Sequence, residues 1–131
     1  MKSDGQRFGE AAEILAQQWL RKKGYRILER NIRLPGGELD MIVRHGDMLV
    51  FVEVKARRTD KYGGAPYAIH RSKEQRMIKL AAQYMAQLSP ETFHAGPCRF
   101  DVILCQQKLN GPIEIQHIEN AFEVSGEDLR W

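Results

Sequence analysis

The chain has 131 residues, a net charge of +3 and a hydrophobic fraction of 43%, which is typical of one globular domain with a substantial core. Its apolar runs fall short of the roughly 20 residues that a membrane-spanning helix needs. The first residues lack the apolar stretch of a signal peptide, and the two cysteines have neither disulfide-framework nor zinc-site spacing. We therefore expect a single cytoplasmic domain over residues 1–131, with no membrane association, whose mild basicity is compatible with a polyanionic partner.

The hydrophobic pattern predicts an α/β fold. Apolar residues three and four apart indicate two helices, and alternating or continuous apolar runs indicate five strands. Ser72 is a candidate N-cap for the second helix, with Gln75 three residues later. The predicted segments are, in chain order, a helix over 6–23, strands over 25–32, 38–44 and 48–56, a helix over 72–88, and strands over 99–105 and 113–118.

Two segments are predicted to be irregular. Residues 57–69 contain a Gly-Gly pair, a proline and several charges, so we expect a mobile loop there. Residues 120–131 are polar, and we expect a loosely held tail outside a core of about 5–119. The order of helix, three strands, helix and two strands predicts an α/β sandwich around a small mixed sheet that is flanked by helices.

Three charged residues stand in or at the end of otherwise apolar strands. Twelve residues separate Asp40 from Glu53, so a hairpin turn near Gly46 makes them near cross-strand partners, with Cβ atoms about 5 Å apart if they share a face. Glu53 and Lys55 are two apart in one strand and therefore share a face. Buried charges are unfavourable unless something binds them. A solvated ion pair is the simpler alternative for such residues.

Facing carboxylates repel each other, and a divalent cation relieves that repulsion. Carboxylate oxygens suit Mg²⁺ or Mn²⁺. The first helix offers a third acid, because Glu13 borders its predicted buried face, whereas Glu10 and Gln17 are expected on the solvent side. Glu13 is either a member of the site or simply a boundary glutamate. The pattern favours a metal site with Lys55 as its partner, and hence phosphodiester cleavage.

A combination of short motifs resembles the YraN family of small bacterial proteins, which are predicted endonucleases. That family is related in pattern to archaeal Holliday junction resolvases and to the restriction-endonuclease-like superfamily with the PD-(D/E)xK signature. The two central blocks are specific when they occur together at this spacing. The motifs are Gly9-x-x-x-Glu13, Trp19-Leu20-x-x-x-Gly24-Tyr25, Arg30-Asn31, Gly37-Glu38-Leu39-Asp40-x-Ile42, Phe51-Val52-Glu53-Val54-Lys55-x-Arg57, Lys73 and Arg99-Phe100-Asp101-Val102.

The resemblance implies an αβββαβ nuclease core with a Mg²⁺- or Mn²⁺-dependent site. It implies that Glu13, Asp40, Glu53 and Lys55 are the catalytic positions. Asp40 and Glu53 are the implied metal ligands, together with the backbone carbonyl of Val54 and with Glu13 directly or through a water. Leu39 stands where the signature has proline, which is a common relaxation in the superfamily.

Basic residues on either side of the 57–69 segment are candidates for contacts with DNA phosphates. Asp101 interrupts a strand that reads as buried, and a structural role, such as pairing with Arg99, is preferred to catalysis. The expected nucleic-acid contacts are Arg57, Arg58, Lys61, Arg71, Lys73 and Arg76. A solvated basic surface is the alternative for each of them.

The leading functional hypothesis is a metal-dependent endodeoxyribonuclease that acts on DNA, with branched or structured DNA as a candidate substrate. A non-catalytic nucleic-acid-binding module that retains the fold is the alternative, and a protein-binding adaptor is a third. The sequence leaves the oligomeric state open. A homodimer would suit a substrate with two scissile strands.

Overall fold

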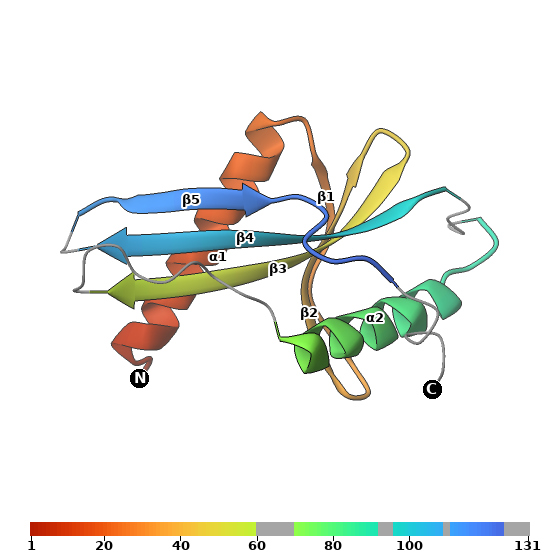
Figure 1. Cartoon of the computed structure of the whole chain (residues 1–131), viewed down its shortest axis with the longest axis horizontal. Coiled ribbons are helices and arrows are strands. Elements are labelled where there is room, and N and C mark those ends of the chain that lie inside the picture. Colours follow the sequence, from red (N-terminus) through yellow and green to blue (C-terminus); the bar gives the residue numbers. More distant parts are fainter. Residues whose placement is uncertain (60–69, 92–95, 109–110, 125–131) are drawn as a thin grey trace.

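The computed structural model describes residues 1–59, 70–91, 96–108 and 111–124. Within these residues the strands form one five-stranded sheet in the order β1-β2-β3-β4-β5. The β3–β4 pair is parallel and the other neighbouring pairs are antiparallel. This mixed sheet and the element order confirm the expected α/β class and αβββαβ core (Figure 1). The elements are α1 (Asp4–Lys22), β1 (Arg26–Leu34), β2 (Gly37–His45), β3 (Met48–Thr59), α2 (Arg71–Ala86), β4 (Cys98–Lys108) and β5 (Ile113–Ile118).

Local sequence explains the connections. The β2–β3 hairpin closes at the His45–Met48 pair, and Gly46 in its two-residue turn has φ +62°, which glycine adopts without a Cβ penalty. Parallel strands cannot be joined by a tight turn, so the chain returns from the end of β3 to the start of β4 through α2.

The two helices cover opposite faces of the sheet. Successive residues of a strand point to opposite sides, so neighbouring residues of β3 contact different helices. Val50 and Val52 pack toward α1, whereas Phe51 packs toward α2. In the described residues, no helix is both long and apolar enough to cross a bilayer. The α1 side of the core includes Ala12, Ala16, Leu20, Met41, Val43 and Ile103, and the α2 side includes Met77, Leu80, Tyr84, Ile42 and Phe100.

Several element boundaries differ from the sequence-based expectation. The strand β3 continues to Thr59, so residues 57–59 are not part of a loop, and residues 60–69 lie outside the described residues. The helix α2 begins at Arg71 after His70, so Ser72 is not its N-cap. Residues 98–108 pair with β3 along its full C-terminal half, and this pairing extends both strands beyond their apolar stretches.

The ends of the chain are better ordered than the sequence suggests. A capping box joins Ser3 and Gln6 and starts α1 before residue 6. The expectation of a loosely held tail fails for its first residues, because Phe122 is buried and its ring stacks 4.8 Å from that of Phe100. The backbone N–H of Ala121 donates to the carbonyl of Phe100 at 2.7 Å. Residues 125–131 lie outside the described part of the chain.

Candidate functional site

The candidate site lies where β2 and β3 separate. Their ladder runs regularly as far as the Met41–Val52 pair. One residue further on, a side chain replaces the backbone as the acceptor. Oδ2 of Asp40 accepts a hydrogen bond of 2.8 Å from the backbone N–H of Val54. The hairpin register therefore brings Asp40 beside the Glu53–Lys55 segment, as the spacing from Gly46 predicts.

A pocket of about 390 Å³ opens at this point between α1 and the end of β3. It brings together every predicted catalytic and metal-binding residue, including Glu13 from the helix and the Val54 backbone. We call it the acidic pocket. The residues that line it are Gln6, Gly9, Glu10, Glu13, Asp40, Glu53, Val54, Lys55 and Ala56.

Among the acids of the pocket, Asp40 has the most strongly raised pKa. Burial, and next the negative charge of Glu53, raise the pKa of its carboxyl to about 7 from an ordinary 3.8. The hydrogen bond from Val54 and the charge of Lys73 oppose this rise without cancelling it. An ionised Asp40 therefore has too little positive charge around it at neutral pH.

Glu13 is also held in an unfavourable environment for a carboxylate. Burial and then the charge of Glu38 raise its pKa, while Arg30 and a hydrogen bond with Asn31 lower it. Asn31 has φ +52°, a conformation that asparagine tolerates better than most residues. The Arg30-Asn31 pair of β1 thus faces Glu13 across the sheet–helix interface.

Glu53 has a cationic partner that the sequence did not predict for it. Its Oε1 lies 3.0 Å from Nζ of Lys73, and the Glu53 side chain is only 12% exposed. Within the described ranges, no three His, Cys, Asp or Glu side chains stand close enough together to hold a metal ion. A cation at Asp40 and Glu53 would therefore compete with Lys73 for the Glu53 carboxylate.

A second depression of about 480 Å³ adjoins the acidic pocket and shares Glu53 and Lys55 with it. Three of the predicted nucleic-acid contacts line it, namely Arg57, Lys73 and Arg76. We call it the basic hollow. His70 and Ser72 from the start of α2 complete its wall.

Among the described residues, the predicted contacts Arg58 and Arg71 do not line either depression. The guanidinium of Arg58 lies over the ring of Phe8 on α1, 5.0 Å from its centroid. Arg71 pairs with Glu74 at 3.2 Å. Lys61, together with the 60–69 segment, lies outside the described residues.

Sequence reasoning missed some residues of the site. Gln6 and Gly9 line the acidic pocket beside Glu13, and their three- and four-residue spacing along α1 was the available signal. His70 was read as a loop residue without a role, yet it lines the basic hollow. Gln17, expected on the solvent side of the helix, is buried instead.

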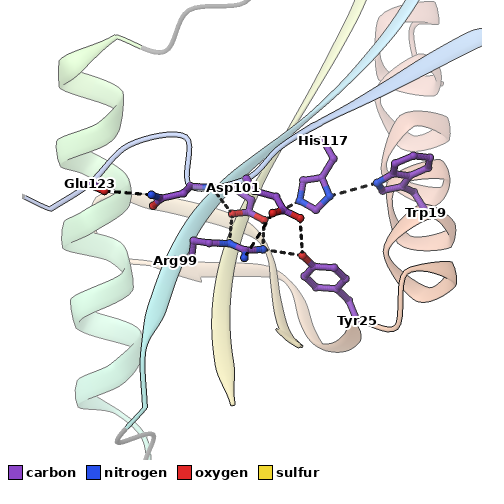
Figure 2. A network of polar contacts seen from close by, with 8 residues as sticks. Trp19, Tyr25, Arg99, Asp101, His117 and Glu123 are labelled. Atoms are coloured by element: carbon purple, nitrogen blue, oxygen red, sulfur yellow. Dashed lines mark hydrogen bonds and ion pairs between the residues drawn. The ribbon is translucent and has the colours of Figure 1, made fainter. Parts of the chain in front are cut away.

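Asp101 belongs to a separate network, which includes Trp19 from the C-terminal part of α1 (Figure 2). It is fully buried and pairs with Arg99 at 2.8 Å, which confirms the structural role expected for it. Its second oxygen lies 2.7 Å from Nε2 of His117, and the backbone N–H of Asn120 donates to Oδ1 at 3.0 Å. Burial alone would raise the pKa of Asp101, but the hydrogen bonds with His117 and Arg99 outweigh it and hold that pKa below its ordinary value.

The network ties α1 and its C-terminal turn to β4 and β5. Trp19 Nε1 donates to Nδ1 of His117 at 3.4 Å, and an indole is a donor only, so the imidazole donates through Nε2 to Asp101. Arg99 also donates to the Tyr25 hydroxyl at 2.7 Å. No buried side-chain nitrogen or oxygen of the described residues lacks a hydrogen-bond partner. We therefore assign this network a structural role and call it the clamp.

Comparisons with known proteins agree with the resemblance seen in the sequence. The model of the family described as "Uncharacterised protein family UPF0102" matches residues 12–105. The UPF0102 protein of Symbiobacterium thermophilum is 43% identical over 116 residues, which cover 88% of this chain and 96% of that protein. The UPF0102 protein YraN of Salmonella arizonae is 42% identical over 95 residues, 72% of each chain.

One solved structure is also similar, that of Pyrococcus furiosus SfsA in complex with Ca²⁺. Its TM-score is 0.41 and its sequence identity 19%, and the match covers 92% of this chain and 66% of that one. This chain thus spans slightly less than two thirds of the SfsA chain. The match of the family model to residues 12–105, and relatives above 40% identity that are matched over 72% and 96% of their length, show that the chain belongs to the UPF0102/YraN family.

Proposed function

We propose that this protein is a metal-dependent endodeoxyribonuclease that hydrolyses phosphodiester bonds in the cytoplasm, with branched or structured DNA as its candidate substrate. The observation that carries the proposal is the acidic pocket, which is lined by four acidic residues from α1, β2 and β3, Glu10, Glu13, Asp40 and Glu53, together with a lysine. Structural stability alone does not call for such an arrangement, because it leaves Asp40 with a pKa of about 7.

The donor atoms of the pocket fit Mg²⁺ or Mn²⁺, which prefer oxygen ligands. Asp40 and Glu53 would hold the ion, with the carbonyl of Val54 as a further ligand and Glu13 acting directly or through a water. The raised pKa of Asp40 is the sign of an uncompensated negative charge that a cation would satisfy. A divalent ion bound there supplies a more acidic water and polarises a phosphoryl oxygen.

The lysines of the site have distinct proposed roles. Lys55 lies on the same face of β3 as Glu53 and is exposed at the mouth of the pocket, where it can orient an attacking water or neutralise charge on the phosphate. Lys73 neutralises Glu53 in this structure. A bound phosphodiester offers Lys73 another anion, so Lys73 would pass from the carboxylate to the substrate when the site is loaded.

The basic hollow supports DNA as the partner. Arg57, Lys73 and Arg76 lie next to the acidic pocket, where the flanking phosphates of a bound strand would pass. Arg58, Lys61 and Arg71 remain proposed contacts outside this depression. A homodimer would let two such sites act on two strands, and it is proposed only for a branched substrate.

Cleavage of a panel of branched and linear DNAs in Mn²⁺ tests the proposal. The wild-type chain should cut at least one substrate, and Asp40→Ala and Lys55→Ala should abolish cutting while both variants stay folded by circular dichroism. Lys22→Ala, a change of an exposed cation at the other end of α1, is the matched control and should cut normally. Equal cutting by all four proteins would refute the assignment.

The Glu53–Lys73 pair favours a second candidate function, a non-catalytic nucleic-acid-binding module. In such a protein Lys73 would permanently replace the metal as the counter-charge of Glu53. Salt-dependent DNA binding without cleavage, and without a rise in melting temperature on addition of Mn²⁺, would support this alternative. A protein-binding adaptor would show neither property.

A further inference from the structure

A third depression lies between α2 and the β1–β2 turn, with a volume of about 240 Å³. The turn is fixed against the helix, because Gln83 Nε2 donates to the carbonyl of Pro35 at 2.8 Å. Gly37 begins β2 so close to α2 that a Cβ there would lie 3.3 Å from Leu80 Cδ1. We call this depression the α2 hollow, and these contacts give it a fixed wall.

The charges around the α2 hollow are of one sign. Arg76 and Lys79 stand one helical turn apart and are exposed, and among the described residues neither has an ion-pair or hydrogen-bond partner. By contrast, Arg71 and Lys73 of the same helix both pair with glutamates. No acidic side chain belongs to the described lining, whose other polar side chains, Ser72, Gln75 and Gln83, can each donate a hydrogen bond. Such a lining suits an anion.

The α2 hollow continues the track that starts at the acidic pocket. It shares Ser72 and Arg76 with the basic hollow, which in turn shares Glu53 and Lys55 with the acidic pocket. The three depressions therefore form a connected path from the N-terminal half of α1, across the end of β3 and the start of α2, to the β1–β2 turn. Figure 1 shows that turn next to α2. Among the described lining residues, acidic side chains occur in the acidic pocket and the basic hollow but not in the α2 hollow.

The geometry points to a backbone-phosphate site in the α2 hollow. We infer that Arg76 and Lys79 hold a phosphate of the same DNA strand whose scissile phosphate lies at the acidic pocket, so that the strand runs over α2 rather than toward the C-terminal end of α1. This inference rests on the proposed function. It adds Lys79 and the β1–β2 turn to the substrate path.

The test measures binding of a fluorescein-labelled four-way DNA junction to the full chain, in EDTA and over a series of NaCl concentrations. The double variant Arg76→Gln/Lys79→Gln should bind more weakly and reduce the magnitude of the slope of log K against log salt by about 0.9, the value for one lost phosphate contact on duplex DNA. Its control, Arg21→Gln/Lys22→Gln, removes two cations from the last turn of α1 and should leave the slope unchanged.

A second variant, Gln75→Glu, tests the hollow without removing a cation. Gln75 is exposed on α2, and glutamate keeps its size and helix propensity, so folding should be preserved while a negative charge enters the hollow. We expect this variant to bind the junction more weakly than wild type. Wild-type affinity in Gln75→Glu would overturn the inference.

The outcomes separate this inference from the proposed function. If the wild-type chain binds the junction, and the α2 variants behave like the α1 control, the phosphate site is refuted and the proposed function stands. If the wild-type chain binds no DNA, both are refuted. Calorimetric binding of inorganic phosphate that the double variant loses, with unchanged DNA binding, would assign the hollow to a free anion and also overturn the inference.

Discussion

Replacing Asp40 with asparagine should make the protein more stable at alkaline pH. Asparagine keeps a side-chain oxygen that can accept the hydrogen bond from Val54, now 2.8 Å long, but it carries no charge. The ionised carboxylate is the unfavourable form here, because burial and Glu53 raise the pKa of Asp40 to about 7. The substitution thus removes an electrostatic penalty that the proposed function requires.

The magnitude follows from the difference between the folded and unfolded pKa values. In the unfolded chain Asp40 ionises near 3.8, and in the folded protein near 7, which corresponds to about 4 kcal/mol at 1.36 kcal/mol per pKa unit. Between these two pH values the folded state binds more protons than the unfolded state. The free energy of unfolding of the wild-type chain therefore falls as pH rises, and the contribution of the protonated Asp40 is lost above about pH 7. Some of this will be shared with Glu53, so about 1–4 kcal/mol is expected at pH 8.

Thermal unfolding followed by circular dichroism in EDTA, from pH 4 to pH 9, measures this effect. For a domain of this size about 1 kcal/mol corresponds to a few degrees in melting temperature. Asp40→Asn should melt higher than wild type at pH 8 and at about the same temperature at pH 4. Asp47→Asn, in the exposed β2–β3 turn, is the control for simple loss of an aspartate charge.

Mn²⁺ should reverse the order of stability. A cation that binds only the folded protein raises its melting temperature by mass action, and Asp40→Asn lacks one of the proposed ligands. Wild type should therefore gain stability in Mn²⁺ and the variant should not. A variant that is less stable than wild type at pH 8 in EDTA, or a difference that does not change with pH, would refute the electrostatic reasoning.

Three further perturbations test other parts of the structure. The Lys73→Met variant should bind Mn²⁺ up to about fivefold more tightly by calorimetry, because a partly buried ion pair worth about 1 kcal/mol no longer competes for Glu53. Weaker binding would contradict this. Asp101→Asn should destabilise the chain in urea by about 3 kcal/mol without changing Mn²⁺ affinity, since it removes the buried anion that lies 2.8 Å from Arg99 and leaves only Glu119 at 4.0 Å. An unchanged unfolding midpoint would count against the clamp. Gly37→Ala should lower stability by about 1 kcal/mol or more, because φ is +155° and α2 lies against this residue. Gly9→Ala in α1 should raise stability, and the opposite order of the two variants would be inconsistent with this packing.

Much of the site follows from spacing along the chain. The hairpin turn at Gly46 fixes which residue of β2 approaches Glu53, and strand alternation fixes that Lys55 shares the face of Glu53. Helical spacing put Glu13 at the border of the buried face, and it does line the acidic pocket. These relations are local, so periodicity and turn length were enough to predict them.

Contacts between distant elements were beyond the reach of such arguments. Nothing in local spacing indicates that Lys73 pairs with Glu53, because the two residues come from different elements, α2 and β3, and meet only when the helix packs on the sheet. The burial of Phe122 has the same cause, since a polar segment of sequence gives no sign that Phe100 lies beside it. Strand ends were also misjudged, because β3 and β4 extend each other through backbone pairing that does not depend on apolar side chains.

The amino-acid sequence by itself determined the order of elements, the register of the β2–β3 hairpin and the identity of the acids and lysine that face one another, because turn chemistry and side-chain periodicity act over a few residues. The packing of α2 on the sheet decided which cation neutralises Glu53 and that three depressions join into one path. The packing of α1 against β4 and β5 decided that Asp101 is enclosed in its network. Those properties depend on burial and on charge at short distance between residues far apart in the chain, and both arise only when the layers come together.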